Sequence, residues 1–136
     1  MHTIGYEAFF FLDCTNPISV TISDTVTNIG NSAFVLFTNL TAVTFGTNVT
    51  SIGDGAFSCC YSLTNLMVPD SVTSMGTHAF YFCTGLTSAT IGNSLTSIPQ
   101  YAFYGCQKLT ILTIGKGVTN IGQNACTACT SGQQHV

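Results

Sequence analysis

Residues 49–63 read Val-Thr-Ser-Ile-Gly-Asp-Gly-Ala-Phe-Ser-Cys-Cys-Tyr-Ser-Leu, and the pattern of this stretch returns along the chain every 23 residues. The isoleucine position keeps this period through five copies, as Ile29, Ile52, Met75, Ile98 and Ile121. The alanine and phenylalanine that follow keep the same period until the last copy, where Cys126 replaces phenylalanine. A fixed period of this length is typical of solenoids, because no single unit can bury its apolar face without stacking on the next.

Each unit contains two short extended segments. The first has apolar residues at its first, fourth and sixth positions, as in Leu40-x-x-Val43-x-Phe45, and residues two apart face the same side of a strand. A polar turn follows, and then a second extended segment of the type Val-Thr-Ser-Ile. We expect the first segments of successive units to form a parallel sheet of about five strands. The Ala-Phe-x-x-Cys stretch is expected to carry the chain back as a short helical or 3₁₀ turn.

These copies resemble the BspA-type leucine-rich repeat, whose consensus runs close to Val-Thr-Ser-Ile-Gly-x-x-Ala-Phe-x-x-Cys-x-x-Leu. The resemblance extends from Ile4 to Cys129 and implies a leucine-rich-repeat solenoid of the α/β repeat class that is mostly β. We expect a single domain over residues 1–136, with an irregular first repeat (1–25), regular repeats (26–122) and a degenerate last repeat (123–136). The resemblance also implies a non-catalytic protein-interaction module, since the family is associated with adhesion to host proteins and cells.

The low charge of the chain excludes some partners. Only two residues are basic and five are acidic, so charged residues make up 5% of the chain, against roughly 25% in ordinary globular domains. A chain with so few cations cannot neutralise the phosphates of a nucleic acid. Its apolar runs are also far shorter than the roughly 20 residues that span a membrane. We therefore expect no nucleic-acid partner and no membrane insertion.

The cysteines invite a disulfide or metal interpretation. One repeat position holds cysteine in four regular or final copies, Phe37 in another and Cys14 in the first, so it is a core position where a thiol acts as a small hydrophobe. We predict that this ladder is buried and reduced; its members are Cys60, Cys83, Cys106 and Cys129. Cys126-x-x-Cys129 has a metal-type spacing, but the sequence supplies no second pair and structural zinc needs four ligands. We expect no metal, and Cys59, at a variable position, is the best candidate for oxidation.

Catalytic motifs are missing from the sequence. Asp54 and Asp70 stand in turn positions, and the three histidines lie at unrelated positions of the repeat. There is no Gly-x-x-x-x-Gly-Lys-Ser/Thr loop and no Gly-x-Ser-x-Gly elbow. An enzyme needs several positioned groups in a concavity. We therefore expect a chain that is not an enzyme and that carries no cofactor.

Outward-facing residues of the first segments are expected to form columns down the sheet. Threonine suits such positions because a β-branched side chain fits an exposed strand, and this alone explains many of them. The alternative interpretation is a weakly polar face that binds a protein partner, with Met67 and Ile111 as apolar anchors. The residues predicted for this partner-binding face are Thr41, Thr44, Thr64, Met67, Thr87, Thr90, Ile111 and Thr113.

The two ends of the array depart from the period. Solenoids stay soluble by ending in atypical repeats with a polar outer face, and neither end of this sequence shows such a repeat. The stretch Phe9-Phe-Phe-Leu12 is more apolar than the matching part of any other copy. We predict that the chain self-associates, as a homodimer or a higher assembly, through Phe9, Phe10, Phe11 and Leu12.

Two interpretations of the location and role of the chain stay open. The resemblance implies a cell-surface or secreted module that binds a host or extracellular protein. The N-terminus lacks the basic and apolar regions of a signal peptide, and the cysteines suit a reducing compartment. These two features favour the alternative of a cytoplasmic scaffold or assembly protein. The sequons at Asn39 and Asn48 matter only in a eukaryotic secretory pathway.

Overall fold

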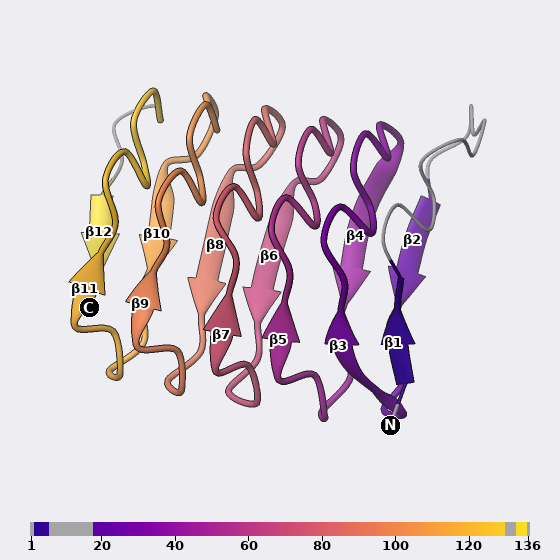
Figure 1. Cartoon of the computed structure of the whole chain (residues 1–136). Helices are drawn as coiled ribbons and strands as arrows, with labels where there is room; N and C mark the ends of the chain where they lie inside the picture. Colours follow the sequence, from indigo (N-terminus) through magenta and orange to yellow (C-terminus); the bar gives the residue numbers. More distant parts are fainter. Residues whose placement is uncertain (1, 6–17, 130–132, 136) are drawn as a thin grey trace.

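The chain winds as a solenoid whose coils lie side by side along one axis, with the N-terminus at one end and the C-terminus at the other (Figure 1). This computed structural model describes residues 2–5, 18–129 and 133–135. Every strand pairing among these residues is parallel, and partners in regular coils are 23 residues apart, as in Met67 with Thr90. The expected parallel-strand solenoid is therefore confirmed.

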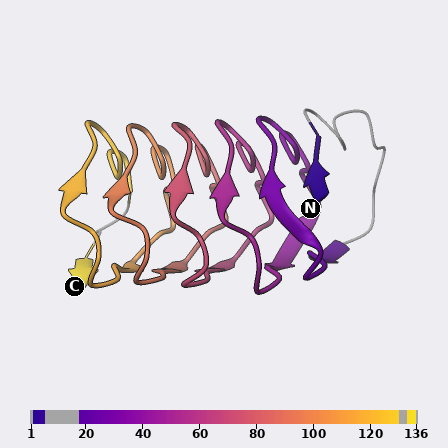
Figure 2. The same ribbon diagram turned by 60° about the horizontal axis from the view of Figure 1, so that its bottom comes forward.

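The strands form two rows, one on each long side of the coils (Figures 1 and 2). The first row contains β2 (Ile18–Thr21), β4 (Leu40–Thr44), β6 (Asn65–Val68), β8 (Ser88–Ile91), β10 (Ile111–Thr113) and β12 (Gln133–His135). The second row contains β1 (His2–Ile4), β3 (Val26–Ile29), β5 (Ser51–Ile52), β7 (Ser74–Met75), β9 (Ser97–Ile98) and β11 (Asn120–Ile121). The Val-Thr-Ser-Ile segments thus form a second row of strands, opposite the row that the sequence predicted.

Each row is interrupted once, so the hydrogen-bonded sheets are β2-β4, β6-β8-β10-β12, β1-β3-β5-β7 and β9-β11. The break in the second row has a clear cause. In other coils a glycine N–H after the second strand donates to the coil before it, as Gly53 N does to Ile29 O at 2.8 Å and Gly122 N to Ile98 O at 2.7 Å. Pro99 occupies this position between β7 and β9 and has no N–H to donate.

The return segment is not the helical turn that the sequence suggested; the described residues contain no helix. Its N–H groups alternate in direction. Phe34 N donates to Ala56 O of the next coil at 2.7 Å, whereas Ala33 N closes a tight turn onto Gly30 O at 3.3 Å. Two residues per coil, four apart, have φ between 54° and 76°; they are 32 and 36, 55 and 59, 78 and 82, 101 and 105, and 124 and 128. A helix needs negative φ at every residue, so these residues exclude one.

We call this return segment, residues 30–37 and the equivalent residues of later coils, the turn edge. Within the described ranges, no helix has the length and apolar character to span a bilayer.

The core between the two rows consists of ladders of identical or similar side chains. Phenylalanine rings stack from coil to coil with centroids 4.8 Å apart for Phe34 and Phe57, 5.2 Å for Phe57 and Phe80, and 5.5 Å for Phe80 and Phe103. All four rings are fully buried, and among the described residues no polar or charged residue is buried. Stacking thus gives every coil the same apolar interior, as a solenoid requires.

The predicted ladder of reduced cysteines runs beside the rings, but only three of its four predicted members are buried, because Cys129 in the last described coil is half-buried. Cys60, Cys83 and Cys106 are buried, and each thiol donates to the carbonyl of a phenylalanine in the preceding coil, at 3.1–3.2 Å. Burial raises the pKa of Cys60 to about 12 and also raises the pKa of Cys83. The pKa of Cys106 is raised by its hydrogen bond with Cys83 and by burial. These three thiols are therefore neutral and unreactive core groups.

The corners of the coils are held by aspartate and asparagine side chains. Asp54 Oδ1 accepts a hydrogen bond from Thr77 N at 2.9 Å, and Asp70 Oδ1 accepts one from Asn93 N at 2.7 Å. Asn31 Oδ1 accepts from Asp54 N in the same way, at 2.8 Å. Each acceptor serves the N–H of the equivalent residue one coil later. The two aspartates therefore act as structural turn residues.

The left-handed residues of the turn edge lead to a test with two glycines. A Cβ at Gly55 would lie 3.6 Å from its nearest neighbour, whereas a Cβ at Gly105 would lie 2.7 Å from the Phe82 ring. We expect Gly55→Ala to lower the free energy of unfolding by about 1 kcal/mol, the strain of a left-handed residue. Gly105→Ala should lower it by more, because the Phe82 ring must also move. Urea unfolding of both variants measures this, and equal losses would contradict the described packing.

The buried thiols predict a loss of stability at alkaline pH. Above pH 9 the unfolded chain releases thiol protons that the native core retains, so the unfolded state binds fewer protons than the native state. The free energy of unfolding should then fall by up to about 1.4 kcal/mol per pH unit for each such thiol. We expect a shallower fall for Cys83→Ala than for the native sequence, measured by urea unfolding from pH 7 to pH 10. Equal slopes would contradict a neutral, buried Cys83.

Candidate functional site

The predicted threonine face lies on the first strand row. Its exposed members are Thr44, Thr64, Met67, Thr87 and Ile111, and its half-buried members are Thr41, Thr90 and Thr113. One column of this face, formed by Thr41, Thr64 and Thr87, makes hydrogen bonds from its side chains to neighbouring coils. Thr87 Oγ1 donates to Thr64 O at 3.0 Å, and Thr41 Oγ1 donates to Ile18 O at 3.1 Å. This column therefore uses its hydroxyl groups to join neighbouring coils, which is a structural role.

The column that contains Met67 has a different character. Met67 pairs with Thr90 on β8, and Thr90 pairs with Thr113 on β10. The Met67 side chain is 68% exposed, the largest exposed fraction among the exposed large apolar residues of the described chain. Ile111, at the start of β10, is 48% exposed and lies two coils away, about 10 Å at the usual strand spacing. The structure therefore exposes both predicted anchor residues to solvent on the same row.

A hollow of about 220 Å³ opens next to Met67. It is lined by Val43, Thr44, Phe45, Met67 and Pro69 and contains no charged residue. It lies at the interruption of the first row, between β4 and β6. Near the start of the same two strands, the main-chain hydrogen bond from Thr64 N to Thr41 O is 3.5 Å long, against 2.8 Å and 3.0 Å for the equivalent hydrogen bonds in the next two coils.

One side chain that lines the hollow, Phe45, packs against the core. Phe45 is half-buried, and its ring packs edge-on against the core ring of Phe57, with centroids 5.8 Å apart. An uncharged hollow of this kind can accept an apolar side chain of a partner but offers no group for acid–base chemistry.

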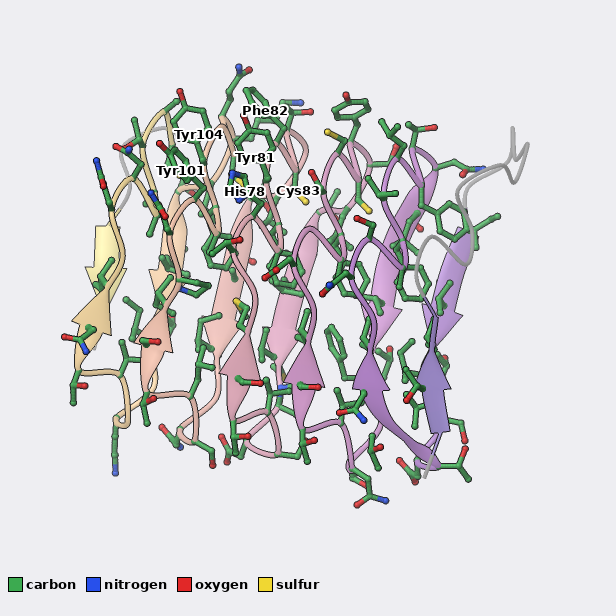
Figure 3. All side chains as sticks on the ribbon, in the orientation of Figure 1. His78, Tyr81, Phe82, Cys83, Tyr101 and Tyr104 are labelled. Atoms are coloured by element: carbon green, nitrogen blue, oxygen red, sulfur yellow. The ribbon has the colours of Figure 1, made fainter. Side chains whose placement is uncertain are left out.

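A second surface was not predicted from the sequence. On the turn edge, five partly exposed residues form a continuous aromatic cluster, shown with labels in Figure 3: His78, Tyr81, Phe82, Tyr101 and Tyr104. The rings of His78 and Tyr101 stack with centroids 4.8 Å apart, and those of Tyr81 and Tyr104 stack at 5.5 Å. The sequence signal was the 23-residue spacing of these two pairs. It was easy to miss because the other copies carry unrelated residues there.

Of the other residues that the sequence singled out, some lie within the described ranges and some lie outside them. Phe9, Phe10, Phe11 and Leu12 lie outside the described residues, so self-association through them stays a prediction. Cys59 is half-buried on the turn edge. In the described part of the chain no three histidine, cysteine, aspartate or glutamate residues gather as a metal site would require. Cys126 and Cys129 therefore have no third histidine, cysteine, aspartate or glutamate beside them among these residues to complete a metal site.

The repeat geometry agrees with the comparison against protein families. The model of the BspA type leucine rich repeat region matches residues 2–132 in six copies. The chain belongs to the BspA-type leucine-rich repeat family. Membership of this family indicates a protein-interaction role for the domain. The comparison with curated proteins gave no match.

Solved structures support the same assignment of this BspA-type repeat domain. A leucine rich cell surface protein from Faecalibacterium prausnitzii is 30% identical with a TM-score of 0.74, over 82% of this chain and 29% of that protein. The pneumococcal vaccine antigen PcpA is 27% identical with a TM-score of 0.78, over 95% of this chain and 33% of that protein. The T. pallidum leucine-rich repeat protein, 22% identical with a TM-score of 0.60 over 88% and 66%, shares the fold. This chain thus spans about a third of the first two relatives.

Proposed function

We propose that this chain is a non-catalytic binding module that attaches to a host or extracellular protein at the cell surface. The observation that carries the proposal is Met67, which stands 68% exposed beside an uncharged hollow on a face otherwise rich in threonine. The Faecalibacterium relative, a cell surface protein by its description, supports the location.

The chemistry of this face suits an apolar anchor contact. Binding energy at protein interfaces concentrates in a few well-packed side chains near the centre, surrounded by contacts that mainly exclude water. Met67 and the hollow beside it supply such a centre, and the neighbouring threonines supply a neutral rim. Because the chain carries only two basic and five acidic residues, long-range steering contributes little. Affinity then depends on the fit at Met67 and, further along the row, at Ile111.

The binding proposal predicts a selective effect of Met67→Thr. Threonine stands at the equivalent position of β8 and β10, so the variant keeps the strand and should change stability by less than about 0.5 kcal/mol. We expect the native chain to bind at least one protein in a panel of purified extracellular-matrix and serum proteins, measured by surface plasmon resonance. Met67→Thr should raise the Kd roughly tenfold or more.

Tyr61→Thr is the matched control for this experiment. Tyr61 is also exposed, at 43%, but it precedes β6 by four residues and does not line the hollow, so its replacement should leave the Kd unchanged. A Kd that responds to Tyr61→Thr and not to Met67→Thr would contradict the proposed face. Absence of binding to the whole panel, together with no surface labelling of intact source cells, would favour the intracellular scaffold instead.

Self-association is the second part of the proposal. It rests on the composition of the stretch from Phe9 to Leu12, four consecutive large apolar residues, since contiguous apolar surface is typical of sites where another protein chain binds. We expect light scattering to give the mass of a dimer or larger assembly at tens of micromolar, and Phe10→Asp to reduce it to a monomer. A native chain that is already monomeric at this concentration would contradict the prediction.

A further inference from the structure

The last described coil brings two cysteines together where earlier coils pack a phenylalanine. On the turn edge, a residue and the third residue after it both face the core, as Phe34 and Phe37 do with ring centroids 6.2 Å apart. In the last copy the same two positions are Cys126 and Cys129. Their sulfur atoms lie 2.8 Å apart. The repeat geometry itself therefore creates the pair as soon as cysteine replaces phenylalanine.

The two thiols differ in how they are held. Cys129 Sγ donates to Phe103 O at 3.2 Å, which is the bond that each ladder cysteine makes to the preceding coil. The Cys126 thiol has no such carbonyl and donates to Cys129 Sγ. The hydrogen bond with Cys129 lowers the pKa of Cys126, and the same contact raises the pKa of Cys129. Cys126 is thus the thiol that ionises first. Once it has ionised, the Cys129 thiol can turn its single proton from Phe103 O to the Cys126 sulfur 2.8 Å away and so stabilise the thiolate.

Exposure separates this pair from the rest of the ladder. Cys126 and Cys129 are both half-buried, whereas Cys60, Cys83 and Cys106 are fully buried. Reactive cysteines combine partial exposure with a stabilised thiolate, and buried thiols with a raised pKa are inert. Cys126 meets both conditions for reactivity.

The backbone between the two cysteines also allows a disulfide. Cys129 N donates to Cys126 O at 3.3 Å, so residues 126–129 form a tight turn, with Ala128 at a φ of 65°. A turn of this kind keeps its end Cα atoms within about 7 Å, and a disulfide joins Cα atoms about 4.4–6.8 Å apart. The sulfur atoms need to approach by less than 1 Å to reach the bond length of about 2.05 Å.

From this geometry we propose that Cys126 and Cys129 form a thiol–disulfide exchange site whose substrate is the disulfide of a low-molecular-weight thiol. The Cys126 thiolate attacks one sulfur of that disulfide, and the first thiol leaves as a thiolate while a mixed disulfide forms on Cys126. Cys129, after losing its proton to solvent, attacks Cys126 Sγ and releases the second thiol. The pair loses two electrons and two protons, and the small disulfide is reduced to two thiols.

The test is a titration with glutathione and its disulfide, followed by acid quenching, alkylation and peptide mass mapping. We expect a Cys126–Cys129 disulfide whose fraction rises with the ratio of oxidised to reduced glutathione, while Cys83 stays reduced. In Cys129→Ser, glutathione should remain attached to Cys126, because the resolving thiol is missing. Cys126→Phe is the matched control, since it restores the residue of the other copies and should fold without forming the bond.

A second measurement tests the roles of the two thiols. Cys126 should react with iodoacetamide at pH 7 faster than Cys59, and Cys129→Ala should slow it because the donor to the thiolate is removed. The proposal is overturned if no 126–129 disulfide forms at any glutathione ratio, or if Cys126 is alkylated as slowly as Cys83. Glutathione attached to Cys129 rather than Cys126 in the native chain would reverse the assigned roles.

Discussion

Each coil of this protein must place its backbone at hydrogen-bonding distance from the equivalent backbone of its neighbours, about 4.8 Å away. Many N–H groups of the strands and corners, and alternate N–H groups of the turn edge, donate to residues one coil apart, so every coil depends on its neighbours. The constraint reaches individual residues. A Cβ at Gly53 would lie 2.5 Å from Asn31 N, so glycine is needed for the two coils to approach. Where Pro99 replaces the equivalent glycine, the second strand row is interrupted.

Close stacking also explains why the interior is uniform and the exterior is not. Phenylalanine packs on phenylalanine and cysteine on cysteine, because equivalent side chains of adjacent coils occupy adjacent sites. Outward-facing side chains carry no such restriction. Met67 can therefore stand where the next coils have threonine, and aromatic residues can gather on the turn edge of two coils only. The surface of the solenoid is where differences between copies can accumulate, and a binding role depends on such differences.

How much of this could be predicted differs from one feature to the next. The strands and the reduced cysteine ladder followed from which residues recur at which positions. The sequence predicts a helical turn at the turn edge, because Ala-Phe-x-x-Cys has apolar residues three apart, as a helix does. The structure has a non-helical turn there, because the positive φ of residues such as Leu36 depends on hydrogen bonds to the next coil. The outward positions of Thr44 and Met67 were predictable. The hollow beside them was not, since it depends on how β4 and β6 lie relative to each other, and these two strands do not belong to one hydrogen-bonded sheet.

The sequence alone determined the architecture, because units with a 23-residue period can bury their apolar positions only by stacking. Stacking then places equivalent residues of neighbouring coils side by side. The sequence also predicted that Cys60, Cys83 and Cys106 are core groups, since they share a position with Phe37. Only the tertiary structure decided how non-equivalent residues meet: the His78–Tyr101 stack, the hollow at Met67 and the 2.8 Å contact of Cys126 with Cys129. These contacts depend on the twist and spacing of neighbouring coils, which the period specifies only on average.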